Sequence, residues 1–112
     1  PEMQDQISLQ AGKAIANHIP PGDGLIVVEY EQGTNSPVLL YFARRRGWSL
    51  DMQTISPQVI KHLMGAGATH FATTDFPLLE DKRPDIVEHL RMYREVPLGE
   101  RAPTVAKLFE LH

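Results

Sequence analysis

The most hydrophobic stretch of the chain follows the turn Pro20–Asp23. It contains four consecutive apolar residues, Leu25–Val28, and three of them are β-branched. A short apolar run without polar alternation is typical of a strand that is buried on both faces. The pattern therefore predicts a central strand over Gly24–Tyr30 with helices on both of its faces.

Helical periodicity lies on both sides of this strand. Apolar residues at three- and four-residue steps predict an amphipathic helix over Gln6–His18. Its apolar positions are Ile7, Ala11, Ala14, Ile15 and His18, and its polar positions are Gln6, Gln10, Lys13 and Asn17. A second helix is predicted over Pro37–Arg46, because Ser36 suits the N-cap and proline suits the first helical position. Gly47 is predicted to end this helix in the left-handed conformation.

The rest of the chain repeats the alternation of strand and helix. The predicted elements are a strand at Trp48–Leu50, a helix that Ser56 and Pro57 begin and Gly65–Gly67 ends, a strand at Ala68–Thr74, a loop at Leu78–Arg83, and a helix that Pro84 opens with the buried stripe Ile86, Val87, Leu90 and Tyr93. Two further strands, Arg94–Leu98 and Thr104–Leu111, flank a short turn and are predicted to form an antiparallel hairpin.

These elements predict a single α/β domain over residues 1–112. The fold class is a Rossmann-like, three-layer α/β/α sandwich, since strands that alternate with helices form parallel sheets through right-handed crossovers. The first three strands are predicted to be parallel in the order 2-1-3. The C-terminal antiparallel hairpin follows, and its last strand has apolar residues on both faces, which suits a middle position.

Composition narrows the function classes. The chain has no cysteine, which excludes disulfides and thiolate metal sites and leaves the cellular compartment open. The net charge is -3 and basic residues cluster only at Arg44–Arg46, so no nucleic-acid partner is predicted. No apolar run approaches the ~20 residues of a membrane-spanning helix. The first residue is Pro1 instead of methionine, which indicates a processed chain or a piece of a larger protein.

The candidate place for a ligand is beyond the carboxyl ends of the first and third strands, where the winding direction of the sheet reverses. This crevice would be lined by Glu29, Tyr30, Ser36, Thr73, Thr74 and Asp75. Two carboxylates that face a helix N-terminus could hold a polar ligand. The alternative is purely structural, because polar residues are ordinary at strand ends and helix capping alone explains Ser36.

The remaining chemical candidates are weaker. Arg44, Arg45 and Arg46 could contact a phosphate or an anionic lipid head group, or could simply be the solvated end of a helix. The five histidines do not form a ligand pair at helical spacing, so no metal is predicted. His70 is predicted to be a core or edge histidine that could titrate near neutrality. The loop after Tyr30 has a single glycine, so a dinucleotide fingerprint is absent and no cofactor is predicted.

The order of these features resembles a known family. The segment Ser36–Leu50, read as SPVLLYFARRRGWSL, resembles the pattern S-P-x-x-L-Y-Y-x-x-R-x-G-W of the C-terminal domain of bacterial multi-spanning glycosyltransferases. These enzymes are similar to dolichyl-phosphate-mannose protein mannosyltransferases. Gly65–Thr74 resembles the entry to a strand of that domain, and Tyr93–Leu98 with Val105–Leu111 resembles its terminal pair of strands.

The resemblance implies that the parent protein transfers a sugar from a polyprenyl-phosphate donor. Its catalytic acidic residues would lie near the first membrane helices, so none is carried over to this chain, and the isolated domain is expected to be inactive. The implied partners are the upstream transmembrane region, lipid head groups and the polyprenyl-phosphate sugar. The implied location is the extracytoplasmic face of a bacterial membrane.

Two other functions stay open. The chain could be a stand-alone module that binds a small ligand in the crevice, and it would then be cytoplasmic. It could also be a purely structural or interaction domain.

Overall fold

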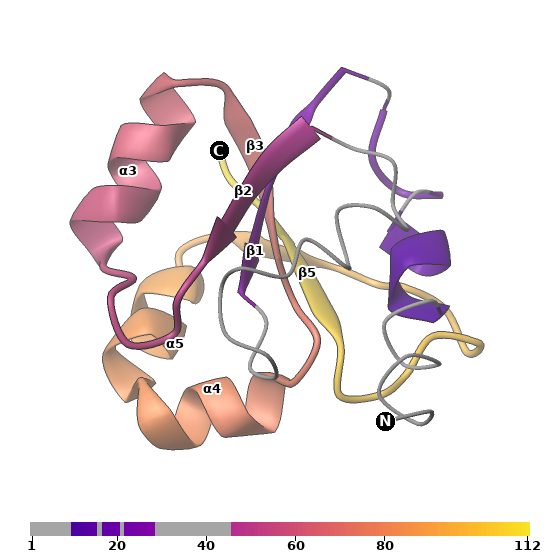
Figure 1. The fold of residues 1–112 in the computed structure, drawn as a ribbon. Coiled ribbons are helices and arrows are strands. Elements are labelled where there is room, and N and C mark those ends of the chain that lie inside the picture. Colours follow the sequence, from indigo (N-terminus) through magenta and orange to yellow (C-terminus); the bar gives the residue numbers. More distant parts are fainter. Residues whose placement is uncertain (1–9, 16, 21, 29–45) are drawn as a thin grey trace.

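A five-stranded sheet runs through the middle of the protein (Figure 1). The computed structural model describes residues 10–15, 17–20, 22–28 and 46–112. The strands lie in the order β2-β1-β3-β5-β4. Their bounds are β1 Gly24–Val28, β2 Arg46–Leu50, β3 Ala68–Thr73, β4 Arg94–Val96 and β5 Lys107–Glu110. Strands β2, β1 and β3 are parallel to one another, and β5 is antiparallel to both of its neighbours, β3 and β4. This confirms the predicted order 2-1-3 and the C-terminal hairpin.

Strand β1 is the buried centre of the parallel part of the sheet. All of its residues are buried, and Leu25–Val28 are fully inaccessible to solvent. Leu25 and Val27 belong to one hydrophobic cluster, whereas Ile26 and Val28 belong to another. Successive side chains of a strand point to opposite faces. The prediction that this strand is covered on both faces is therefore confirmed.

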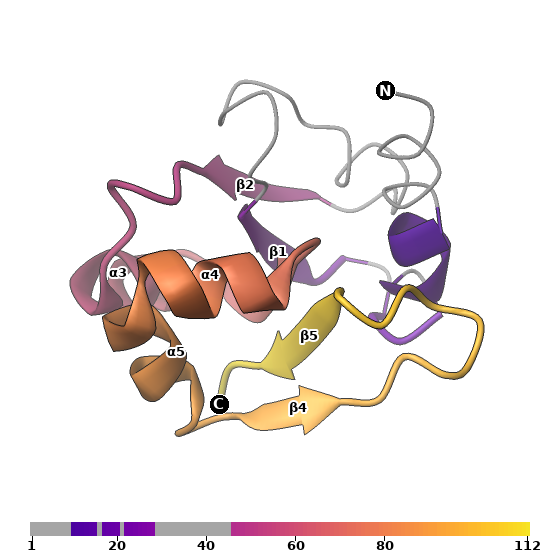
Figure 2. The same cartoon turned by 90° about the horizontal axis from the view of Figure 1, so that it is seen from below.

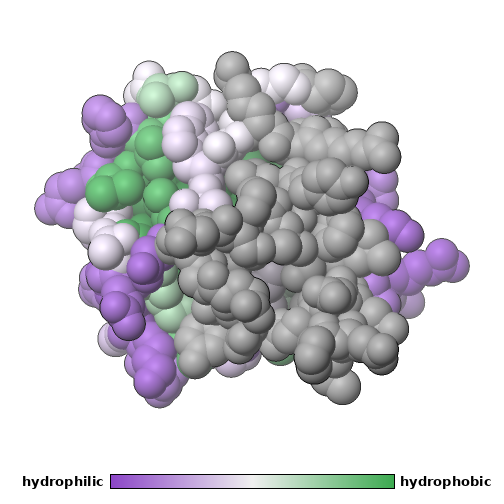
Figure 3. All heavy atoms as spheres, in the orientation of Figure 1, coloured by the Kyte–Doolittle hydropathy of each residue, from purple (hydrophilic) through white to green (hydrophobic). Residues whose placement is uncertain are grey.

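Helices cover the two faces of the sheet (Figure 2). Helices α3 Pro57–Gly65, α4 Phe76–Lys82 and α5 Pro84–Leu90 lie on one face, over the cluster that contains Ile26, Phe71 and Leu90. The helical turn at residues 10–15 lies on the other face, over the cluster that contains Ile15 and Leu25. The arrangement is the predicted three-layer α/β/α sandwich. Apolar surface is visible over α3 in Figure 3, where Leu63 and Met64 are only partly buried.

The segment after β3 differs from its prediction. Residues 78–83 were expected to form a loop, but Phe76–Lys82 forms α4. Asp75 is the N-cap, and its Oδ1 accepts a hydrogen bond from the N–H of Leu78 at 3.1 Å. Pro77 lies in the first turn, where its missing N–H costs nothing. The buried side chain of Leu79 then anchors the helix to the sheet.

The start of β2 also differs from its prediction. Gly47 was expected to end a helix in the left-handed conformation, and Arg46 was expected to be that helix's last residue. Both residues instead belong to β2, where Arg46 pairs with Gly24 and Gly47 pairs with Leu25. The left-handed glycines are Gly22, Gly67 and Gly99 among those that the structure describes. The rest of the predicted helix, residues 37–45, lies outside the described residues.

Smaller differences concern boundaries and one side chain. Strand β3 ends at Thr73, and both hairpin strands are shorter than predicted. His18 was expected on the buried stripe of the first helix but is exposed, and its Nδ1–H donates to the carbonyl oxygen of Ala14 at 2.7 Å. Ile19 is buried there instead. Among the described helices, none combines the length and hydrophobicity that crossing a bilayer requires.

Candidate functional site

The predicted crevice can be followed at the carboxyl end of β3. Thr73 pairs with Val28 of β1, so the ends of the two strands lie side by side as expected. Thr73 is buried, and its Oγ1 accepts a hydrogen bond from the N–H of Asp75 at 3.2 Å. Because Asp75 caps α4, these polar groups begin a helix within the protein, and Thr74 beside them is half-buried.

The other predicted site residues fall largely outside the described part of the chain. Glu29, Tyr30, Ser36, Arg44 and Arg45 lie there. The structure therefore brings Thr73, Thr74 and Asp75 together at one strand end, and it describes no partner for them from the first strand.

The opposite end of the sheet holds a buried histidine. His70 of β3 is only 4% exposed, and β3 lies between β1 and β5, so His70 is a core histidine and not an edge one. Its Nδ1 lies 2.8 Å from Oγ1 of Thr69, and that hydroxyl donates to the carbonyl oxygen of Gly24 at 3.1 Å. A hydroxyl has one proton to donate. Nδ1 of His70 therefore carries the proton and donates to Thr69.

Charged groups surround His70 at this end. The carboxylate of Asp23 lies 3.9 Å from Nδ1. Glu110 of β5, which pairs with His70 in the sheet, forms an ion pair with Arg94 at 3.3 Å, and its Oε2 lies 3.6 Å from Nε2 of His112. Burial lowers the pKa of His70, and the attraction of Asp23 and Glu110 opposes this effect without reversing it. His70 is thus held neutral within a cluster of charges.

A second buried histidine lies in α5. His89 packs edge-on against the ring of Tyr93 at 5.4 Å, and its Nε2 lies 3.4 Å from the hydroxyl of Tyr93. Burial lowers the pKa of His89, and the positive charge of Lys61 lowers it further. Both buried histidines therefore favour the neutral form in the folded protein.

We expect acid to destabilise the fold because of these two histidines. In the unfolded chain they bind protons near pH 6.5, whereas in the folded protein they bind them at lower pH. The unfolded state therefore binds more protons between these pKa values, and stability must rise with pH there. The stabilisation from the two neutral histidines, measured by urea unfolding, should be fully present above about pH 7 and should fall as the pH drops below about 6.5.

The variants His70→Gln and His89→Gln test this pH dependence. Each should flatten the profile of unfolding free energy between about pH 7 and 5, and His62→Gln, at an exposed position of α3, should leave it unchanged. Glu110 and Asp85 stay ionised in this range, because hydrogen bonds from Arg94 and Arg83 lower the pKa of these two carboxyl groups. A flat profile for the unmodified protein would contradict the prediction.

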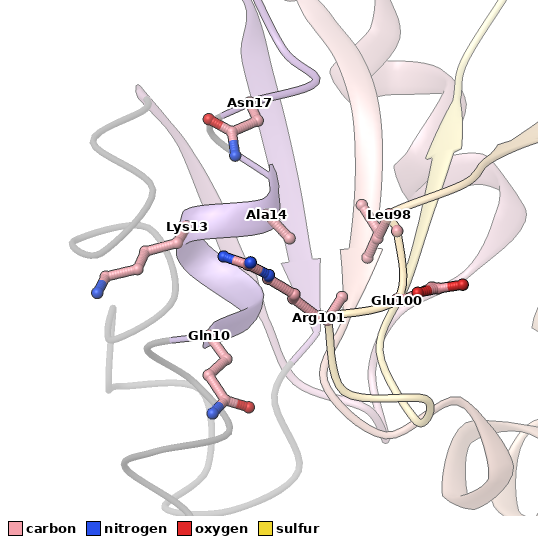
Figure 4. A pocket seen from close by; sticks show the side chains of 9 residues that line it. Gln10, Lys13, Ala14, Asn17, Leu98, Glu100 and Arg101 are labelled. Carbon is pink, nitrogen blue, oxygen red and sulfur yellow. The ribbon is translucent and has the colours of Figure 1, made fainter.

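One surface hollow lies between the helical turn and the loop that joins β4 to β5 (Figure 4). We call it the helical-turn groove. Its volume is about 520 Å³, and its lining residues are Gln10, Lys13, Ala14, Asn17 and the loop residues 98–102. Arg101 points toward the helical turn, whereas Glu100 and Lys13 point away from the groove. Arg101 forms no ion pair with another described residue.

A second hollow lies between the helices α4 and α5 and the C-terminal hairpin. We call it the hairpin pocket; its volume is about 430 Å³. Its lining residues are Phe76, Val87, Arg91, Tyr93, Glu95, Lys107 and Phe109. Three aromatic rings and three charged side chains therefore meet there. This combination suits a ligand that has both an apolar face and hydrogen-bonding groups.

Neither the helical-turn groove nor the hairpin pocket was predicted from the sequence. The hairpin pocket depends on α4, which was expected to be a loop, and on the register that places Phe109 opposite Glu95. In the sequence, the available indication of this pocket was the pair of aromatic residues Phe76 and Tyr93, which lie before and after Pro84. Among the described residues, no group of three or more histidine, aspartate or glutamate side chains is arranged to hold a metal ion.

Comparisons with protein-family models, with curated proteins and with solved structures find no match to this chain. Its function is therefore inferred from the resemblance of its segments to a known family and from its own geometry.

Proposed function

We propose that this chain is an accessory domain of a bacterial multi-spanning glycosyltransferase similar to dolichyl-phosphate-mannose protein mannosyltransferases. In this proposal the upstream transmembrane region transfers a sugar from a polyprenyl-phosphate donor. The domain lies at the extracytoplasmic face, next to lipid head groups and that donor. Its own residues take no catalytic role, and they shape the surroundings in which acceptor or donor approaches the membrane.

The supporting observation is the packing of the pair Gly47-Trp48, which ends the segment that carries the resemblance. A side chain at Gly47 would overlap the backbone of Leu25, so only glycine lets β2 approach β1 this closely. Trp48 packs against the core, and a Cβ built at Gly24 would lie 3.1 Å from its ring and 2.6 Å from the carbonyl oxygen of Gly67. The pair thus has a defined role in building this sheet. A chance similarity would not need to include residues with such a role.

The other segments of the resemblance agree with the observed elements. Gly65–Thr74 covers the end of α3 and all of β3, Tyr93–Leu98 contains β4, and Val105–Leu111 contains β5. The three similar segments therefore correspond to structural units of one sheet in chain order. This correspondence favours kinship in fold over a short local match.

The proposal is tested in the full gene product. The reading frame upstream of Pro1 is expected to encode several hydrophobic stretches of about 20 residues. Membranes that contain the full product should transfer sugar from a polyprenyl-phosphate donor, and the isolated chain should not. A start codon close to Pro1, with no membrane-spanning segments before it, would refute the proposal.

A further inference from the structure

We propose that the hairpin pocket binds a sugar ring. The pocket combines aromatic walls with a rim of paired charges. Aromatic rings can contact the C–H groups of a pyranose, and charged groups can bond to its hydroxyls. The inference deepens the proposed function and rests on it for the source of the sugar, which would be the glycan acceptor or the sugar of the donor. The binding chemistry itself is argued from the pocket.

Aromatic side chains form the apolar part of the pocket. The rings of Phe76 and Phe109 pack against each other with centroids 6.1 Å apart. Val87 and Phe109 are almost fully buried and form the floor of the pocket, and the half-buried rings of Phe76 and Tyr93 offer its apolar surface. Such a surface suits one face of a pyranose, where several C–H groups point the same way and hydroxyls are few.

Tyr93 is held rigidly at the side of the pocket. Its hydroxyl lies 3.4 Å from Nε2 of His89 and donates to Sδ of Met64 at 3.6 Å. The hydroxyl is therefore engaged with α5 and α3, and the tyrosine ring is left to border the pocket. A wall that is fixed before the ligand arrives loses little conformational entropy on binding.

The rim carries both signs of charge, already in pairs. Nζ of Lys107 donates to Oε2 of Glu95 at 2.9 Å and also lies 5.0 Å from the ring centre of Phe76. Arg91 contacts the carboxylates of Glu88 at 3.4 Å and Glu80 at 3.9 Å. Lys107, Arg91 and Glu95 thus place donors and an acceptor around the aromatic floor, and Glu88 and Glu80, which do not line the pocket, offset the charge of Arg91.

This balance of charge selects for a neutral polar ligand. A phosphate would meet the carboxylate of Glu95, and a cation would meet Lys107 and Arg91. Sugar hydroxyls both donate and accept hydrogen bonds, so they can bond to both members of the Lys107–Glu95 pair. The helical-turn groove differs, because Arg101 there lacks an ion-pair partner among the described residues and suits an anion better. We therefore assign the sugar to the hairpin pocket, whose volume lies within the ~300–1,000 Å³ of small-molecule sites.

An amide NMR titration of the chain tests the assignment. The probes are methyl α-mannoside, methyl α-glucoside, methyl α-galactoside and N-acetylglucosamine, each up to about 100 mM. At least one sugar should shift the amide signals of Phe76, Tyr93 and Lys107 saturably, with a dissociation constant in the range of about 1–10 mM. Inorganic phosphate at the same concentration should leave these amides unshifted.

Two variants examine the two parts of the pocket. Glu95→Gln keeps the size of the side chain but breaks the pair with Lys107, and Phe76→Leu keeps apolar volume but removes the ring. Each should weaken sugar binding about tenfold or more, whereas Arg101→Ala in the helical-turn groove should not change it. Circular dichroism and the unshifted remainder of the NMR spectrum establish that the variants are folded.

Three results would overturn the inference. These are the absence of sugar-dependent shifts at the hairpin pocket, shifts there with phosphate in place of sugar, and unchanged affinity in both Glu95→Gln and Phe76→Leu. None of them bears on the upstream membrane spans, which test the proposed function separately. Conversely, a chain without upstream spans that still binds a sugar in this pocket would refute the proposed function and keep the site.

Discussion

Replacing Gly47 with alanine is expected to destabilise the protein by about 3 kcal/mol or more. A Cβ atom at this position would overlap the carbonyl oxygen of Leu25 and lie 2.8 Å from its carbonyl carbon. These are backbone atoms of the central strand, so no side-chain rotation relieves the overlap. Strand β2 would have to move away from β1 and weaken the pairing along Arg46–Leu50. Urea unfolding followed by circular dichroism measures the loss.

Gly65→Ala is the matched control for this substitution. No heavy atom lies within 4 Å of a Cβ built at Gly65, which is the last residue of α3. Alanine is also the better helix former, so the control should be neutral or slightly stabilising. If Gly47→Ala were as stable as the unmodified protein, β2 would not approach β1 as described, and the packing argument for the family resemblance would fail with it.

The centre of the fold was predictable because the burial of apolar side chains dominates the energetics there. Leu25–Val28 has no polar residue, and a chain of this length has one core in which to place such a run. Helical periodicity on either side then requires crossovers, and their fixed hand leaves few strand orders. The hairpin followed from two apolar stretches around a turn. These inferences use hydrophobicity and connectivity, both of which are local in sequence.

The predictions for residues 78–83 and for Gly47 were wrong because one residue type can serve two purposes. Residues 78–83 were predicted to be a loop, although Asp75 as N-cap with Pro77 in the first turn equally begins a helix, as Ser56 and Pro57 do for α3. Gly47 was read as a helix end, because the close approach of a neighbouring strand is not visible in the sequence. Tertiary contact decided both cases.

The candidate site was less predictable than the fold. The crevice was placed by analogy with other parallel sheets, and its described members Thr73 and Asp75 are engaged in beginning α4. The hairpin pocket joins residues that are far apart in the chain, and it depends on side-chain register and on ion pairs such as Lys107 with Glu95. No periodic pattern in the sequence indicates that these residues lie together in the fold. His70 was identified as a residue of interest, but its charged surroundings required the sheet pairing.

Leu25→Ala and Ile26→Ala are each expected to lower the free energy of unfolding by about 2–5 kcal/mol, because each truncation leaves a cavity in a closed core. The two side chains are fully buried in different clusters, one beneath the helical turn and one beneath α3–α5. A strand with one face open to water would show one costly position and one nearly neutral position. Two large losses at adjacent residues require cover on both faces.

Ser49→Ala in β2 is the control for these truncations. Its hydroxyl is buried and has no hydrogen-bond partner within the described part of the chain, so removing it should cost nothing and should slightly stabilise the sheet. Urea unfolding of the three variants under one condition compares them directly. If either Leu25→Ala or Ile26→Ala proved as mild as Ser49→Ala, one layer of the sandwich would be missing. The face of β1 left open would then be the place to look for the surface on which the chain meets a partner.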